Sequence, residues 1–254
     1  MKKIRMIVTD LDGTLLHHDK TVSPETLSVI ARARAAGALF VIATARPIRG
    51  VKGFIPGLEF DGALYHNGAV AAWRGERLEG FGVAQPLEVV NLIRATDPAL
   101  WMAVEADDKL YSNFNATALW PGVAYTRTED FREIARAVAD KIIVEARTLE
   151  ELEAVSRLLP DDLYAQLSEN RIAMIMNRRA TKENGVRLLA KRLGIGMDEI
   201  AAFGDDYNDI GMLRACGAGV AVENALDEVK AAADDVCPCN EADGPARWIE
   251  EKIL

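Results

Sequence analysis

Two aspartates, Asp10 and Asp12, stand two residues apart in the stretch TDLDGTLL, where a short apolar run ends. A second acidic stretch, GDDYND, covers residues 204–209 and also follows an apolar run. Clustered carboxylates raise one another's pKa unless a cation lies among them, and a hard divalent ion such as Mg²⁺ fits oxygen ligands beside a phosphate. Taken alone, DLDG is equally consistent with a simple turn, but the second acidic stretch favours a metal site. The candidate metal-binding residues are Asp10, Asp12, Asp205 and Asp209.

Two further residues could hold a phosphoryl group. Thr44 ends the apolar run ALFVIAT, and a hydroxyl beside free backbone N–H groups can bind phosphate oxygens. Lys182 carries a positive charge that can neutralise charge developing on a transferring phosphoryl group. Taken alone, Thr44 is more typical of a simple strand end, and Lys182 of a solvated surface. Their assignment to a phosphate site therefore depends on the elements that position them.

The elements expected in the first part of the chain alternate between buried strands and a helix. Residues 6–9 form a short apolar run typical of a buried strand. Ser23, followed by proline and glutamate, is a typical helix N-cap, and Gly37 is a suitable stop. A second strand is expected to end at Thr44, and a third in GALYHNGA to end in the turn at 67–68. This order predicts right-handed crossovers and a parallel sheet.

The pattern changes between residues 83 and 178. A helix, two strands of a possible hairpin and a third strand are followed by a helix whose Thr148 and Glu151 fit a capping box, and by a strand at 171–176. Helices and strands alternate again from ENGVRLLAKRLG onward. We therefore expect a core of residues 1–82 and 179–254 with an inserted α+β unit at 83–178. Because ligands bind at the carboxyl ends of parallel strands, the candidate residues should meet at one edge.

Four segments, in this order, resemble the motifs of the haloacid dehalogenase-like phosphatases: DLDGTLL, ATAR, ATKENGVRLLAKRLGI and GDDYNDIGML. The likeness is greatest to the Cof-like branch, subfamily IIB, which has a large cap between the second and third motifs. The NGA of residues 67–69 and the segments VAVENALDEVKAAAD and EADGPARWIE resemble that branch too. The resemblance covers essentially the whole core, whereas the insert matches only in placement and style. It implies an α/β fold, a Rossmann-like parallel-sheet core with an inserted α+β cap domain.

The resemblance also implies roles for the acids. Asp10 would be the nucleophile that forms an aspartyl-phosphate, and Asp12 the general acid that protonates the leaving alcohol and then activates water. The cofactor would be Mg²⁺, held by the Asp10 side chain, the Asp12 backbone carbonyl and the Asp205 side chain. Asp209 would support the metal through its water shell.

Other motif residues would contact the substrate or shape the loops. Thr44 and Lys182 would grip phosphoryl oxygens, and Asn208 would reach the phosphate or the substrate. Arg46 is present as in the motif, but the resemblance leaves open whether it binds phosphate, substrate or its own loop. 

Four neighbouring positions carry expectations about local geometry. Ala45 stands where the family usually has glycine, which is tolerable if the turn keeps a negative φ. Glu183 follows the motif lysine and is expected to point outward at a helix start, where a negative charge is favoured. Gly13 should permit the bend after the first strand, and Thr14 should steady Asp12.

Composition restricts the partners. With 30 basic and 39 acidic residues the formal charge is −9, and no long basic block is present, so nucleic acid is not an expected partner. Cys216, Cys237 and Cys239 are too few and too unevenly spaced for a disulfide framework or a zinc site, and are expected to be reduced thiols. The apolar run after the basic start is broken at Asp10, and no stretch approaches the ~18 apolar residues of a membrane span. We expect a cytoplasmic protein, a monomer or weak homodimer.

These observations predict a magnesium-dependent phosphatase for small phosphorylated metabolites, with sugar phosphates as the favoured class and the cap as the source of selectivity. A phosphomutase of the same capped fold and a non-catalytic phosphate-ligand-binding protein are the alternatives, and the clustered charges argue against the second. A dinucleotide-binding protein is disfavoured because the first strand leads into DLDGTLL rather than a Gly-x-Gly-x-x-Gly turn. Four aromatic residues of the insert could face a substrate or fill its core: Trp101, Tyr111, Trp120 and Tyr125.

Overall fold

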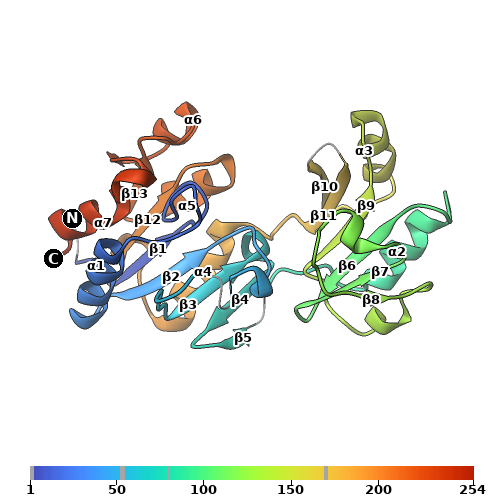
Figure 1. Cartoon of the computed structure of the whole chain (residues 1–254), viewed down its shortest axis with the longest axis horizontal. Helices are drawn as coiled ribbons and strands as arrows, with labels where there is room; N and C mark the ends of the chain where they lie inside the picture. Colours follow the sequence, from blue (N-terminus) through green and yellow to red (C-terminus); the bar gives the residue numbers. More distant parts are fainter. Residues whose placement is uncertain (1–2, 52–54, 79, 169–170) are drawn as a thin grey trace. The chain divides into compact units, whose positions relative to one another are not determined.

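The computed structural model describes residues 3–51, 55–78, 80–168 and 171–254 (Figure 1). Two compact units make up the chain: unit 1 comprises residues 1–80 and 181–254, and unit 2 comprises residues 81–180. Unit 1 contains an eight-stranded sheet and unit 2 a six-stranded sheet. The chain therefore has the predicted α/β core and a separate α+β unit.

The sheet of unit 1 has the strand order β14-β13-β12-β1-β2-β3-β4-β5. Its strands are β1 (Met6–Thr9), β2 (Leu39–Ala43), β3 (Gly62–Tyr65), β4 (Val70–Trp73), β5 (Glu76–Leu78), β12 (Ile200–Gly204), β13 (Ala218–Val222) and β14 (Asp235–Cys237). All neighbours from β14 to β3 pair in parallel, as predicted. The hairpin of β4 and β5 is antiparallel and was not predicted. Its turn uses Arg74 (φ 49°) and Gly75 (φ 83°), which suits a two-residue hairpin loop.

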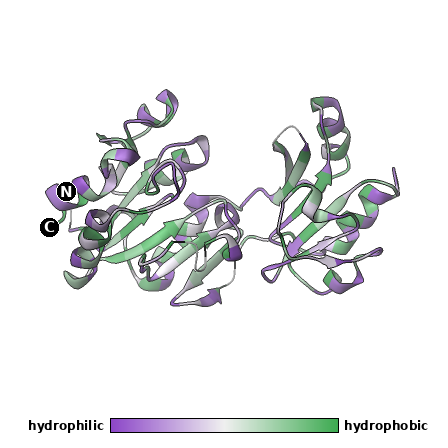
Figure 2. Cartoon of the chain, viewed as in Figure 1, coloured by the Kyte–Doolittle hydropathy of each residue, from purple (hydrophilic) through white to green (hydrophobic). Residues whose placement is uncertain are grey.

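Helices pack on this sheet in two neighbouring pairs, α1 with α7 and α4 with α5. The helices of unit 1 are α1 (Pro24–Ala35), α4 (Lys182–Leu193), α5 (Ile210–Ala215), α6 (Asp227–Lys230) and α7 (Gly244–Lys252). The start of α1 follows the predicted signal, because the Ser23 side chain accepts a hydrogen bond from the Thr26 backbone N–H at 3.0 Å. Figure 2 shows hydrophobic colouring concentrated on the central strands, whose residues are buried along their length.

The sheet of unit 2 has the order β10-β11-β9-β6-β7-β8 and is antiparallel except for the pair β7 and β8. Its elements are α2 (Pro86–Arg94), β6 (Met102–Ala106), β7 (Lys109–Ser112), β8 (Thr126–Arg127), β9 (Lys141–Glu145), α3 (Leu149–Ser156), β10 (Leu163–Ser168) and β11 (Ile172–Asn177). The predicted β6–β7 hairpin and the capping box of α3 are both confirmed. One face of the sheet packs against α2 and α3, and a smaller apolar cluster lies on the other face.

Short 3₁₀ turns connect these elements: η1 (Ile48–Gly50), η2 (His66–Gly68), η3 (Ala116–Ala118), η4 (Arg132–Ile134), η5 (Met197–Glu199), η6 (Tyr207–Asp209) and η7 (Asn240–Ala242). Within the described ranges, no helix combines the length and the apolar character that crossing a bilayer requires. The three cysteines are free thiols in this structure, and two of them, Cys216 and Cys237, are buried.

Candidate active site

The carboxyl ends of three adjacent strands in unit 1 place the main candidate residues together. Strand β1 lies between β2 and β12, and Thr9 at its end pairs with Ile42 on one side and Phe203 on the other. Asp10 follows β1 directly, Thr44 follows β2, and Asp205 follows β12. The parallel pairing is therefore what gathers residues almost two hundred positions apart in the sequence.

Three carboxylates form the centre of the site. Asp10, Asp205 and Asp209 each offer one oxygen atom, and these atoms lie within 4.8 Å of one another. Asp209 is fully buried and Asp10 is 6% exposed, whereas Asp205 is half-buried. The second oxygen of Asp209 accepts the backbone N–H groups of Asp205 at 3.1 Å and Asp206 at 3.2 Å, which fixes the loop after β12. The side chain of Asp12 is not part of this cluster.

Lys182 is the cation of the cluster. Its ammonium, 1% exposed, donates to Asp10 Oδ1 at 2.6 Å and to Asp209 Oδ1 at 2.7 Å. It stands at the first position of α4, where the side chain of Thr181 caps the helix by accepting the Asn184 N–H. Among the described residues, no hydrogen bond reaches the second oxygen of Asp10, Oδ2.

The electrostatics of this cluster fit a divalent cation. Burial raises the pKa of Asp10 despite the nearby ammonium, and burial together with Asp209 raises the pKa of Asp205. Burial opposes the charged form of Lys182, but the two carboxylates outweigh it and raise its pKa. Three carboxylates and one ammonium leave two negative charges uncompensated when all are ionised. The donor set is all oxygen, so a hard ion such as Mg²⁺ suits it.

Asp12 is instead held by two cations at the edge of the site. Arg46 donates from Nε to Asp12 Oδ2 and from Nη2 to Asp12 Oδ1, both at 2.6 Å, and Lys20 Nζ donates to Oδ1 at 2.7 Å. Burial acts to raise the pKa of Asp12, but these hydrogen bonds outweigh it and lower the pKa. The sequence left open whether Arg46 binds phosphate, substrate or its own loop. In this structure it binds the Asp12 carboxylate and the backbone carbonyl of Gly50. Sequence reasoning missed Lys20, a turn residue at φ 68° without a motif signal.

Thr44 lies in the turn that directly follows β2. It is 1% exposed, and its hydroxyl oxygen accepts the backbone N–H of Arg46 at 3.1 Å, so the hydroxyl hydrogen remains for donation. Ala45 does not have a positive φ, so this turn meets the condition under which alanine can stand in place of glycine. The Thr44 carbonyl accepts the N–H of Asn67 at 3.0 Å, which ties Thr44 to the η2 turn.

The η2 turn brings Asn67 to the site, although sequence reasoning did not assign this residue to it. His66 (φ 49°), Asn67 (φ 56°) and Gly68 (φ 95°) all have left-handed conformations. A Cβ on Gly68 would collide with the Thr181 carbonyl, so only glycine allows this approach to the start of α4. Asn208 Nδ2 donates to Asn67 Oδ1 at 3.0 Å. Asn208 thus lies beside η2. The NGA pattern of residues 67–69 was the sequence feature that could have identified Asn67 as a site residue.

Three neighbouring expectations have different outcomes. Thr14 was expected to steady Asp12, and this is wrong: its hydroxyl donates to Asp205 Oδ1 at 2.6 Å. Gly13 has φ 82°, as a bend there requires, and a Cβ on it would collide with the Asp205 carboxylate. Glu183 accepts a hydrogen bond from Arg187 Nε at 2.9 Å along α4, which agrees with an outward side chain.

Comparisons with known proteins show one family over almost the whole chain. The profile of the haloacid dehalogenase-like hydrolases matches residues 7–249. A protein of Haemophilus influenzae named as a putative phosphatase is 31% identical, covering 98% of each chain. A 5-amino-6-(5-phospho-D-ribitylamino)uracil phosphatase of Bacillus subtilis is 28% identical over 97% of this chain and 96% of its own. The solved structure of a subclass IIB sugar phosphatase is 23% identical, with a TM-score of 0.77, and covers 98% of this chain and 100% of its own.

Proposed function

We propose that this chain, which belongs to the haloacid dehalogenase-like hydrolases and to their Cof-like branch, is a phosphatase that hydrolyses small phosphomonoesters. The observation that carries the proposal is the buried carboxylate of Asp10, held by Lys182 on one oxygen beside Asp205 and Asp209. The relatives that match nearly its full length and are named as phosphatases support the same conclusion.

Asp10 is the proposed nucleophile. Lys182 fixes Oδ1, and Oδ2 accepts no hydrogen bond from the described residues, so Oδ2 is the atom suited to attack phosphorus. The new bond joins Oδ2 to phosphorus while the bond from phosphorus to the leaving oxygen breaks, giving an aspartyl-phosphate. Lys182 lies within reach of the charge that develops beside Asp10, and Thr44 offers a hydroxyl hydrogen at the end of the neighbouring strand.

Asp12 is the proposed acid and base. A protonated Asp12 gives its proton to the leaving oxygen, and the resulting carboxylate takes a proton from the water that hydrolyses the aspartyl-phosphate. The hydrogen bonds from Arg46 and Lys20 keep Asp12 ionised, so they must loosen before it can donate. We propose that a phosphoryl dianion entering the site competes with Asp12 for these two cations.

The proposed cofactor is Mg²⁺. The side chains of Asp10 and Asp205 and the backbone carbonyl of Asp12 would hold it, with Asp209 supporting the site, and the two uncompensated charges of the cluster suit it. When bound, such an ion neutralises charge on phosphoryl oxygens and so lets a carboxylate approach a phosphate dianion.

Unit 2 is the proposed cap that selects the leaving group, with sugar phosphates as the favoured class. Two relatives support this class by their names: one acts as a sugar phosphatase, and the other on a phosphoribityl compound. Measuring release of phosphate from a panel of phosphorylated metabolites tests it. A panel in which sugar phosphates are the poorest substrates would contradict the class.

The activity itself is tested with p-nitrophenyl phosphate in the presence of Mg²⁺. Asp10→Asn should abolish turnover, whereas Asp206→Asn, a control at a neighbouring exposed aspartate, should keep most of it. Unchanged turnover in a folded Asp10→Asn variant would refute the mechanism. In oxygen-18 water, labelled free phosphate identifies hydrolysis, and an isomerised sugar phosphate without label identifies a mutase.

A further inference from the structure

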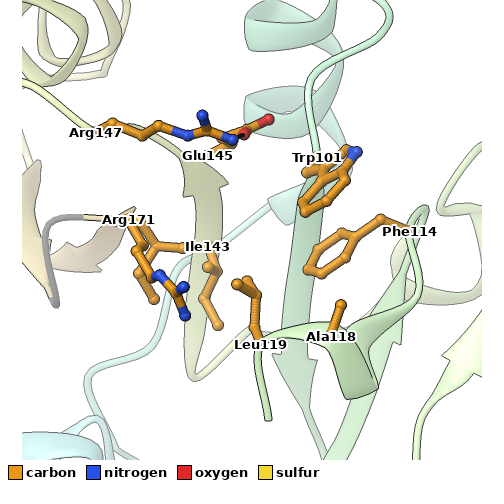
Figure 3. A pocket seen from close by; sticks show the side chains of 9 residues that line it. Trp101, Phe114, Ala118, Leu119, Ile143, Glu145, Arg147 and Arg171 are labelled. Atoms are coloured by element: carbon orange, nitrogen blue, oxygen red, sulfur yellow. Dashed lines mark hydrogen bonds and ion pairs between the residues drawn. The ribbon is translucent and has the colours of Figure 1, made fainter.

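Unit 2 contains a pocket of about 460 Å³ that the proposed chemistry does not use (Figure 3). It lies where β6 begins, β9 ends and β11 begins, because Trp101 immediately precedes β6 and Ile172 pairs with Glu145. Ile143 and Ile172 form apolar lining on the sheet face opposite to the one that packs against α2 and α3. Every lining residue belongs to unit 2, and none is a candidate residue of the acid cluster.

One wall of the pocket is aromatic. The rings of Trp101 and Phe114 stack with centroids 5.0 Å apart and planes only 7° from parallel. Phe114 is buried, whereas Trp101 is 41% exposed. A flat, partly exposed indole already stacked on one side is suited to contact with another planar ring.

The opposite side of the pocket carries one available cation. Figure 3 shows the Arg171 guanidinium across the cavity from the two rings. Within the described part of the chain this guanidinium forms no ion pair or hydrogen bond. Arg147 also lines the pocket, but it donates to Glu145 Oε1 at 2.7 Å, so that pair is internally balanced. The lining therefore offers a single uncompensated positive charge.

We propose that this pocket, the Trp101–Arg171 pocket, binds a small planar aromatic carboxylate. The ring would lie in the apolar part of the cavity against Trp101, and the carboxylate would pair with the two-pronged guanidinium of Arg171. A monoanion fits better than a phosphate dianion, because only one positive charge is uncompensated and the Glu145 carboxylate also lines the pocket. A cavity of this volume holds a molecule of one or two rings.

Calorimetric titration of the full-length protein with indole-3-carboxylate tests the proposal, since a carboxylate cannot be consumed by a phosphatase. Indole-3-carboxamide removes the charge, and cyclohexanecarboxylate removes the planar ring. Both should bind at least tenfold more weakly than indole-3-carboxylate. Arg171→Gln and Trp101→Leu should each weaken indole-3-carboxylate by roughly tenfold or more, whereas Arg132→Gln, at an exposed arginine of the same unit, should not.

The same titration separates this pocket from the acid cluster. Asp10→Asn should bind indole-3-carboxylate as the wild type does. No binding to the wild type at millimolar concentration, equal binding of the amide and the carboxylate, or loss of binding in Asp10→Asn would each overturn the proposal. Arg171 is exposed, so its substitution should leave the melting temperature unchanged and the test does not depend on Trp101→Leu folding normally.

Discussion

Replacing Lys182 with methionine removes the only described cation that touches two of the three clustered carboxylates. The ammonium is 1% exposed and donates at 2.6 Å and 2.7 Å to Asp10 and Asp209. Methionine has an unbranched chain that replaces the aliphatic part of lysine without the ammonium, and its helix propensity is similar, so α4 itself should form normally. The variant would leave Asp10, Asp205 and Asp209 facing one another without a positive charge.

The size of the effect follows from the burial. Removing one partner of a buried ion pair costs about 3–5 kcal/mol, because the remaining charge stays buried and unpaired. At about 2–4 °C per kcal/mol for a chain of this size, the melting temperature in chelator should fall by roughly 6–20 °C. Added Mg²⁺ should raise the melting temperature of the variant more than that of the wild type, because the ion supplies the missing positive charge.

Thermal unfolding followed by circular dichroism, with EDTA and then with MgCl₂, measures both effects. Lys191→Met is the matched control, since Lys191 is exposed near the end of the same helix, and it should change stability by less than about 0.5 kcal/mol. A Lys182→Met variant that melts in EDTA within one or two degrees (about 0.5 kcal/mol) of the wild type would refute the inferred electrostatics of the cluster.

Three further predictions concern neighbouring residues. Without metal, Asp10→Asn should be more stable than the wild type near neutral pH, with the difference shrinking toward about pH 4. Because the pKa of Asp10 is raised in the fold, its protonated carboxyl stabilises the wild type at low pH, and this contribution is lost as the pH rises and the carboxyl ionises. Melts across this range check it, and a pH-independent difference would contradict it. Gly13→Ala should weaken Mg²⁺ binding in calorimetry, because a Cβ there meets the Asp205 carboxylate; unchanged affinity would argue against that contact. Arg46→Lys should lower turnover of p-nitrophenyl phosphate by roughly tenfold, because lysine cannot offer the phosphoryl dianion the two-pronged contact that Arg46 makes with Asp12 in the free enzyme; full activity would show that this contact is dispensable.

The strand ends of unit 1 could be predicted from the sequence because each depends on local signals. The apolar runs before Asp10, Thr44 and Asp205 are short and bounded by polar residues, and parallel pairing then brings their ends to one edge. The start of helix α1 could be predicted equally well, because Ser23 and the following proline are strong helix start signals.

Other features depend on contacts between distant or unpatterned residues. The hydrogen bonds of Arg46 and Lys20 to Asp12 follow from side-chain reach in turns, which no periodicity encodes. Thr14 lies two residues from Asp12 in sequence, yet the sharp bend at Gly13 turns its hydroxyl toward Asp205. Proximity along the chain was therefore a poor guide to the partner.

The aromatic residues of unit 2 show the same limit. Tyr111 packs with the α2 and α3 side of the sheet, while Trp120 and Tyr125 pack against the opposite cluster. Only Trp101 of the four candidates is exposed. Composition cannot separate these cases, because the choice depends on which face each strand position presents.

Trapping the enzyme during turnover shows whether Asp10 receives the phosphoryl group. The protein is mixed with an aryl phosphate and Mg²⁺, quenched in acid within milliseconds, digested and analysed by mass spectrometry. We expect a phosphoryl group on the peptide that contains Asp10, lost on treatment with hydroxylamine and absent from Asp10→Asn. Release of phosphate at the normal rate with the phosphoryl group on a different residue would contradict this role of Asp10.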